Sequence, residues 1–202
     1  EWIGLTGQSD FRSESGLSLN DHDISAWAID VGLRYDLSDH PASLGMTFSQ
    51  GSGGFDNEES NLFVQTGLHS NRDRYVDTRQ FLYRFNDALR PDLTNLIHGS
   101  LFASYTFKDE YLLAGSVSKF QRDDTLFPIY RNSQPLDMNQ YSDDVGSGID
   151  LSFRHDINTS VLRIPLKFWR VRSSAFLPGD AFNDDSDDTV YRVVLELVGV
   201  FE

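Results

Sequence analysis

Arg170 and Arg172 are the residues whose type and spacing best suit chemistry, and that chemistry is the binding of an anion. Side chains two positions apart lie on the same side of an extended strand, so this pair shares one face, opposite Trp169 and Val171. A guanidinium fork matches the two oxygens of a carboxylate. The surrounding stretch 157–179 holds four basic residues and no acidic one, so we predict an anion-binding face here.

Two further arginines lie on the polar sides of alternating segments. Arg34 belongs to 24–37 and Arg154 to 146–155, and in both segments the opposite side is apolar. A charge packed into a dry core between two protein layers would cost several kcal/mol unless it were paired. A water-filled passage would remove that cost, so we predict that both arginines border one.

The elements that position these residues are predicted to be β-strands, because apolar and polar side chains alternate with a period of two. The segment WAIDVGLRYDL (27–37) is typical, with apolar side chains on one side and charged residues or glycine on the other. The best helical candidate, RFNDALRPDL (84–93), is interrupted by Pro91 and is expected to form a turn. The predicted strands are 1–9, 24–37, 42–50, 74–85, 96–107, 110–121, 146–155, 167–176 and 189–201, with a tenth within 61–68.

Composition excludes several classes of protein. The hydrophobic fraction is 39% and the mean hydropathy −0.39, and no apolar run approaches the roughly 20 residues of a transmembrane helix. The net charge of −14 argues against nucleic-acid binding. There is no cysteine, and the five histidines are scattered without the spacing of a zinc site or a nucleophile. We therefore predict neither an enzyme nor a metal site made by histidine or cysteine.

Two all-β architectures satisfy the alternation: an antiparallel transmembrane β-barrel and a soluble β-sandwich. The barrel is favoured because tight connections (38–42 and 108–109) contrast with long polar ones (51–73, 122–145 and 177–188). Aromatic rings also mark the ends of the apolar faces, as in the girdles at membrane interfaces. The final strand closes on the aromatic Phe201, as the last strand of outer-membrane barrels characteristically does.

Several motifs resemble, in order and spacing, those of the bacterial outer-membrane alginate export porins. They are DVGLRY (30–35), GSGG (51–54), QTGLHSNR (65–72), DLTNL (92–96) and PGDAF (178–182). The resemblance covers most of 1–202 and aligns with the C-terminal half of the family, whose members are eighteen-stranded barrels. It implies that the nine or ten strands here are half of such a barrel. A companion segment, with the signal peptide, would then supply the rest.

The resemblance also implies a function: export of an anionic, alginate-like polysaccharide across the bacterial outer membrane, by diffusion through an arginine-lined lumen and without a cofactor. Phe81 stands where the family has a pore-facing arginine. The acidic residues interleaved in 72–90 leave that stretch a net charge of about +2, so part of its arginines are expected to form structural ion pairs. The resemblance and the strand pattern together predict the lumen residues Arg34, Arg72, Arg79, Arg84, Arg154, Arg170 and Arg172.

The implied partners are the polysaccharide, outer-membrane lipid and periplasmic secretion proteins. The rival function is a porin for the uptake of small anionic solutes. In the family a long periplasmic turn near 157–167 partly plugs the pore, and the turn here is expected to be shorter. Because Arg163 and Lys167 differ in parity from the pair at 170 and 172, a turn or bulge is expected between, at Pro165.

An acidic loop near the end of the chain offers carboxylate oxygens of the kind that bind divalent cations. It lacks the glycine and the closing glutamate of an EF-hand, so a solvated loop is the favoured interpretation and a weak cation site the alternative. The carboxylates of that alternative are Asp180, Asp184, Asp185, Asp187 and Asp188.

Overall fold

The computed structural model describes residues 2–9, 22–56, 59–64, 82–161, 164–183 and 188–199. Eight long strands occur there: β1 (Trp2–Ser9), β2 (His22–Asp36), β3 (Ala42–Gly51), β6 (Leu96–Phe107), β7 (Tyr111–Arg122), β10 (Asp144–Val161), β11 (Ile164–Pro178) and β12 (Val190–Gly199). Four strands of two residues each are β4 (Phe55–Asp56), β5 (Glu59–Ser60), β8 (Tyr130–Arg131) and β9 (Gln134–Pro135). No helix long and apolar enough to span a bilayer occurs among the described residues.

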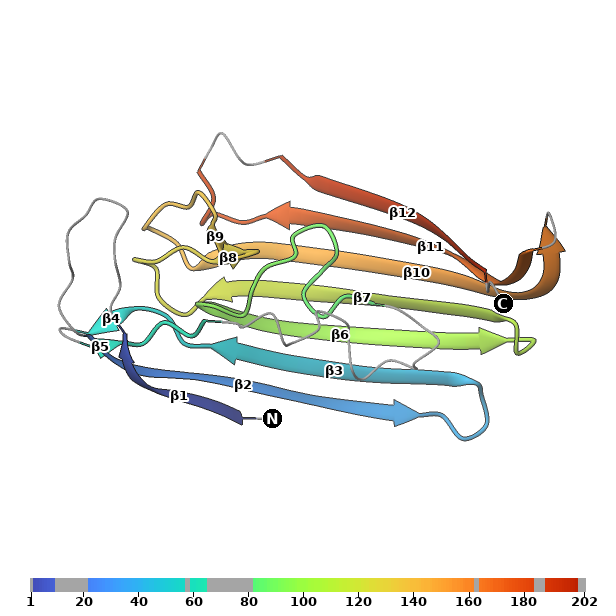
Figure 1. The fold of residues 1–202 in the computed structure, drawn as a ribbon, viewed down its shortest axis with the longest axis horizontal. Helices are drawn as coiled ribbons and strands as arrows, with labels where there is room; N and C mark the ends of the chain where they lie inside the picture. Colours follow the sequence, from blue (N-terminus) through green and yellow to red (C-terminus); the bar gives the residue numbers. More distant parts are fainter. Residues whose placement is uncertain are drawn as a thin grey trace.

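The long strands form one continuous curved sheet (Figure 1). Its order is β12-β11-β10-β7-β6-β3-β2-β5-β4, with β1 also paired to β2. All neighbouring long strands are antiparallel, and only the short β5 runs parallel to β2. The all-β prediction is confirmed. The sheet has ten strands, in agreement with the expected nine or ten, but two of them, β4 and β5, are two residues long and were not predicted, and 61–64 of the predicted tenth strand are not in a strand. A β-sandwich would need two sheets face to face, whereas the long strands share one.

The two faces of the sheet differ as the alternation predicts. On the outer face, which carries Leu33 and Leu195, side chains are bare: these two are 70% and 73% exposed. On the inner face, Asp30 and Asp150 are 6% and 3% exposed. Among the described residues, the rest of the chain therefore packs against the polar inner face, and the apolar outer face is left exposed.

Aromatic rings line the outer face at the end of the sheet where the tight turns lie. Neighbouring ring centroids along β6, β7 and β10 are 4.7 Å apart for Phe107 and Tyr111 and 4.4 Å apart for Tyr111 and His155. Trp169 of β11 extends the row and donates its indole N–H to Nδ1 of His155 over 3.1 Å. This row matches the expected aromatic ends of the apolar faces.

Residues 82–95, which directly precede β6 in the chain, are named here the inner segment. They pack against the inner face of the sheet (Figure 1). The expected turn at 84–93 is confirmed, because this stretch is a series of turns. Positive φ angles at Asn86, Arg90 and Asn95 (63°, 52° and 54°) keep it compact. The predicted strand 74–85 is wrong at Arg84 and Phe85, where these turns begin; Tyr83 forms an isolated β-bridge, and 74–81 lie outside the described residues. The backbone of these turns donates hydrogen bonds to side chains of the strands behind it, such as Asp150 and Ser174. The alternation of apolar and polar residues does not predict such bonds.

An apolar cluster anchors the inner segment toward the long-loop end of the sheet. Phe85 and Leu93 of the segment belong to the same buried cluster as Leu96, Phe120 and Phe176 of the strands. Each of these side chains is 5% exposed or less, so burial of apolar area fixes the segment in place.

Glycines of the inner face allow the inner segment to approach the backbone closely. A Cβ on Gly148 would lie 2.7 Å from the amide nitrogen of Asn86, and one on Gly51 would lie 1.9 Å from the carbonyl oxygen of Leu93. Real Cβ atoms do not tolerate such distances, so any larger residue at these two positions would displace the segment.

The hairpin of β10 and β11 continues both strands beyond their neighbours (Figure 1). Pairing runs up to Val161 and Ile164, and residues 162–163 lie outside the described residues. The expected irregularity is present, but it is a register shift around Lys167, between Leu166 and Phe168. Pro165 was expected in a turn or bulge, but it lies within β11, opposite Ser160 of β10. The described pairing of β11 with β12 starts at Leu166, opposite Gly199, the last described residue of β12.

A candidate anion site on the inner face

Four arginines gather around two carboxylates on the inner face, and we name this group the arginine cluster. Arg172 of β11 places Nη1 2.6 Å from Asp87 and Nη2 2.9 Å from Glu196 of β12. Arg170 donates its Nε–H to Glu196 over 2.8 Å. Arg90 pairs with Asp87 over 2.5 Å, and the Nε of Arg192 lies 3.4 Å from the same carboxylate.

Strand register explains why residues distant in sequence meet here. Arg170 lies directly opposite Glu196, and Ser174 lies opposite Arg192. All four alternate inward, because positions two apart share a face. Asp87 comes from the inner segment, where its backbone N–H donates to Asp150 over 2.9 Å and the next residue, Ala88, donates to Ser174 over 2.9 Å.

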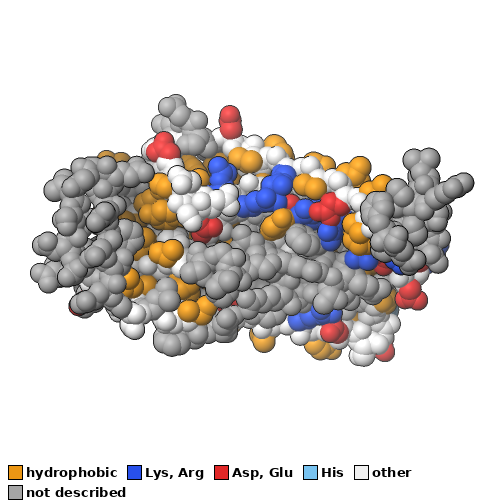
Figure 2. Space-filling model, in the orientation of Figure 1, with side chains coloured by type: hydrophobic (Ala, Val, Ile, Leu, Met, Phe, Trp, Pro, Cys, Tyr) orange, Lys and Arg blue, Asp and Glu red, His pale blue; other side chains and the backbone are white. Residues whose placement is uncertain are grey.

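The arginine cluster carries more positive than negative charge. Among the described residues, its four guanidiniums face two carboxylates, an excess of two within that set. The nearby carboxylate of Asp150 accepts from the Asp87 N–H and from the Asn86 amide instead. Lys and Arg side chains accordingly gather over β10 to β12 in Figure 2.

Burial divides the members of the arginine cluster into two groups. Arg170 and Arg172 are 9% and 7% exposed, and Asp87 is 3% exposed. The side chains of Arg192, Arg90 and Glu196 keep 38%, 30% and 29% of their surface exposed. The cluster is thus a buried ion network with an open cationic side.

A second ion pair joins the inner segment to strands β2 and β3, further along the same inner face. The guanidinium of Arg84 lies 2.8 Å from Asp30 of β2, and both side chains are 8% exposed. Ser49 of β3 donates to the same carboxylate over 2.8 Å. This arrangement satisfies a buried carboxylate, and it serves chiefly to dock the segment.

Two further predicted arginines, Arg154 and Arg34, lie toward the tight-turn end of the sheet. Arg154 pairs with Asp156 over 2.5 Å and stacks on the ring of Phe168, 3.8 Å from its centroid. It lies directly opposite Arg170 across the β10–β11 ladder. Arg34 pairs with Asp36 over 2.7 Å at the end of β2.

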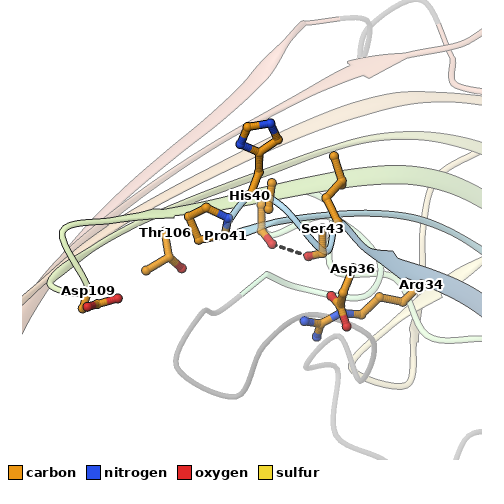
Figure 3. Close-up of a pocket in the computed structure, with 10 residues that line it drawn as sticks. Arg34, Asp36, His40, Pro41, Ser43, Thr106 and Asp109 are labelled. Atoms are coloured by element: carbon orange, nitrogen blue, oxygen red, sulfur yellow. Dashed lines mark hydrogen bonds and ion pairs between the residues drawn. The ribbon is translucent and has the colours of Figure 1, made fainter.

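A cavity of about 300 Å³ opens beside Arg34 (Figure 3). The hydroxyls of Ser43 and Ser104 share a hydrogen bond of 2.5 Å in its wall. Two carboxylates face one guanidinium there, which makes this cavity less suited to an anion than the arginine cluster. Its other polar lining residues include Asp36, His40, Thr106 and Asp109.

The predicted site residues are therefore partly brought together. Arg170 and Arg172 share one cluster, while Arg34, Arg84 and Arg154 each have a separate carboxylate partner. Arg72 and Arg79 lie outside the described residues. The five predicted arginines that are described are all ion-paired. Of these, Arg84 lies in the stretch 72–90, where structural ion pairs were expected.

Sequence reasoning missed four members of the arginine cluster: Arg90, Arg192, Asp87 and Glu196. Arg192 and Glu196 share the parity opposite to Tyr191 and Leu195, so the inward side of β12 was the signal that could have found them. Arg90 was set aside as one charge among many, because its proximity to β11 arises only from the fold of the inner segment.

The predicted acidic loop is only partly described. Asp180 and Asp188 are described, while Asp184, Asp185 and Asp187 are not. No group of three or more potential ligands occurs in the described part of the chain. The weak cation site therefore stays a prediction.

Comparison with known proteins gives a consistent result. The family model "Alginate export" matches residues 1–196. The alginate production protein AlgE of Azotobacter vinelandii is 30% identical over 199 residues, covering 90% of this chain and 40% of that protein. The AlgE proteins of Pseudomonas aeruginosa and Pseudomonas syringae pv. tomato are 31% and 28% identical, over 89% and 98% of this chain. The chain spans about two fifths of the length of these curated relatives. It belongs to the alginate export family.

Proposed function

We propose that this chain is part of the wall of a bacterial outer-membrane channel that exports an anionic, alginate-like polysaccharide. The arginine cluster is the observation that carries the proposal, because its arginines outnumber its carboxylates by two among the described residues. A family of alginate exporters supplies the substrate class, and carboxylates of a uronate chain are natural partners of guanidinium forks.

Transport in this proposal is diffusion and requires no bond chemistry. Each uronate carboxylate exchanges with water and with protein carboxylates at guanidiniums along the inner face. Binding must be favourable enough for the chain to enter yet weak enough for it to leave. Glu196 and Asp87, which already occupy part of the arginine hydrogen-bonding capacity, keep the attraction moderate.

The outer face is proposed to contact outer-membrane lipid, with the tight turns in the periplasm and the long loops outside. Strands β1 and β12 have one described neighbour each. Exposed long edges are a liability that barrels avoid by closing, so further strands are proposed to complete the barrel. Periplasmic secretion partners are proposed at the tight-turn end.

Planar-bilayer recording tests this function. The purified protein should conduct anions in preference to cations, and oligouronates should block the current in a length-dependent way. A neutral oligosaccharide of equal length is the control and should block weakly. Block by small organic acids without block by oligouronates would replace the export function with the porin function.

A further inference from the structure

Arg192 differs from the other arginines of the cluster in how its charge is used. Within the described part of the chain its ion pair is a single contact of 3.4 Å, through Nε, with Asp87. At that distance the contact is ionic and too long for a good hydrogen bond. The side chain is 38% exposed, the largest fraction among the four arginines of the cluster.

Arg170 and Arg172, in contrast, are committed to the protein. Arg172 gives one Nη to Asp87 and the other to Glu196, and its side chain is 8% exposed. Arg170 donates from both Nε and Nη2 to Glu196. A carboxylate arriving from the inner side would have to compete with Glu196 or Asp87 for these guanidiniums, whose side chains are only 11% and 8% exposed.

Asp87 holds Arg192 without covering it. The aspartate is fixed by the hydrogen bond from its backbone N–H to Asp150 and by its ion pairs with Arg172 and Arg90. Its contact with Arg192 is an ion pair through one carboxylate oxygen. The remaining N–H groups of the Arg192 guanidinium, on Nη1 and Nη2, can therefore present a fork to a ligand while Nε stays oriented.

We propose that Arg192 is the residue of this cluster that receives the carboxylate of the polysaccharide, and that Asp87 is its positioning residue. Arg170 and Arg172 supply positive potential and hold the wall together instead of gripping the chain. This assignment rests on the proposed function and narrows it to one residue on β12. It also places the substrate contact on a residue outside the five motifs named above, although within the residues that the family model matches.

Single-channel recording with three variants tests the assignment. Arg192→Gln removes the charge and should raise the apparent Kd for oligouronate block roughly ten-fold to a hundred-fold, the range expected when a charge-assisted hydrogen bond is lost. Arg192→Lys keeps the charge but loses the fork, so anion-over-cation selectivity should persist while oligouronate block weakens. Arg131→Gln removes one exposed charge from β8 and should leave block unchanged.

The outcomes separate this inference from the proposed function. If oligouronates do not block the wild-type channel, the export function fails. If they block wild type and Arg192→Gln with equal affinity, the export function stands and the role of Arg192 is overturned. A thermal unfolding midpoint of Arg192→Gln equal to that of wild type should accompany weakened block, because a partly exposed 3.4 Å ion pair contributes little stability. Weakened block accompanied by a large fall in that midpoint would overturn the inference in favour of a structural role.

Discussion

Asp30 and Arg84 show what the inner face demands of a charged residue. Both side chains are 8% exposed, and their contact is supplemented by the hydroxyl of Ser49. An ion pair this buried is weak evidence for net stabilisation, yet removing one member leaves the other charge without its main counterion. The pair therefore specifies where the inner segment docks more than it adds free energy.

Replacement of Asp30 by Asn should lower the free energy of unfolding by about 3 kcal/mol, because Arg84 would remain charged and buried. The matched change Asp36→Asn removes a partner that is 67% exposed and should cost less than about 1 kcal/mol. Guanidinium titration of both variants in lipid vesicles measures the difference. Equal losses in the two variants would contradict a buried Asp30 pair.

At the scale of elements, the inner segment depends on the small residues of the strands behind it. Asn86 donates its side-chain amide to the carbonyl of Ala175 over 3.1 Å and to the carboxylate of Asp150 over 3.0 Å. These contacts exist because Gly148 leaves room for the amide. The segment is thus positioned by complementarity of shape as well as by ion pairs.

Gly148→Val should loosen the inner segment, because the new side chain occupies the space of the Asn86 amide. We expect a cost of about 1–3 kcal/mol and faster hydrogen exchange at the backbone N–H groups of 87–90. Gly99→Val is the control, since a Cβ there meets nothing within 4 Å, and it should leave exchange in the segment unchanged. Unchanged exchange in Gly148→Val would show that the segment is held elsewhere.

The strands themselves were predictable, with the largest error at the end of β10 (Asp144–Val161 against the predicted 146–155), whereas the packing of the segments between them was not. The predicted strand 96–107 coincides with β6, and 42–50 agrees with β3 (Ala42–Gly51), because each has one bare apolar face and one polar face. The turn at Arg84 and Phe85 was misjudged as strand because aromatic residues alternate there as well. Its burial results from contacts distant in sequence: Arg84 pairs with Asp30 of β2, and Phe85 packs in one cluster with Phe120 and Phe176.

At the scale of the whole molecule, the apolar outer face has to meet something other than water. Exposed apolar side chains recur on every long strand whose side chains are described from β2 to β12, including Leu33, Leu101, Leu151 and Leu195. Soluble proteins seldom leave apolar surfaces of this extent uncovered. We propose that this face contacts membrane lipid.

Two leucines of similar exposure test that lipid contact. Leu151 of β10 is 54% exposed and Leu126, between β7 and β8, is 63% exposed. Leu151→Arg should lower the free energy of unfolding in vesicles by about 2–4 kcal/mol, the cost of an arginine facing lipid near the bilayer midplane. Leu126→Arg, in a loop proposed to lie outside the membrane, should change it by less than about 0.5 kcal/mol. A neutral Leu151→Arg would mean that the outer face contacts water or protein.

The sequence by itself determined the strands, the face each strand turns outward, and the family, because a period of two and collinear motifs are local properties of the chain. Only the tertiary structure decided which charges meet. Arg192 and Asp87 are more than a hundred positions apart, and their contact depends on the register of β12 and the inward fold of 82–95. Coulomb energy depends on distance and burial, not on residue type alone, so the partition of six charged residues into buried pairs and an open cationic side arises from the packed fold.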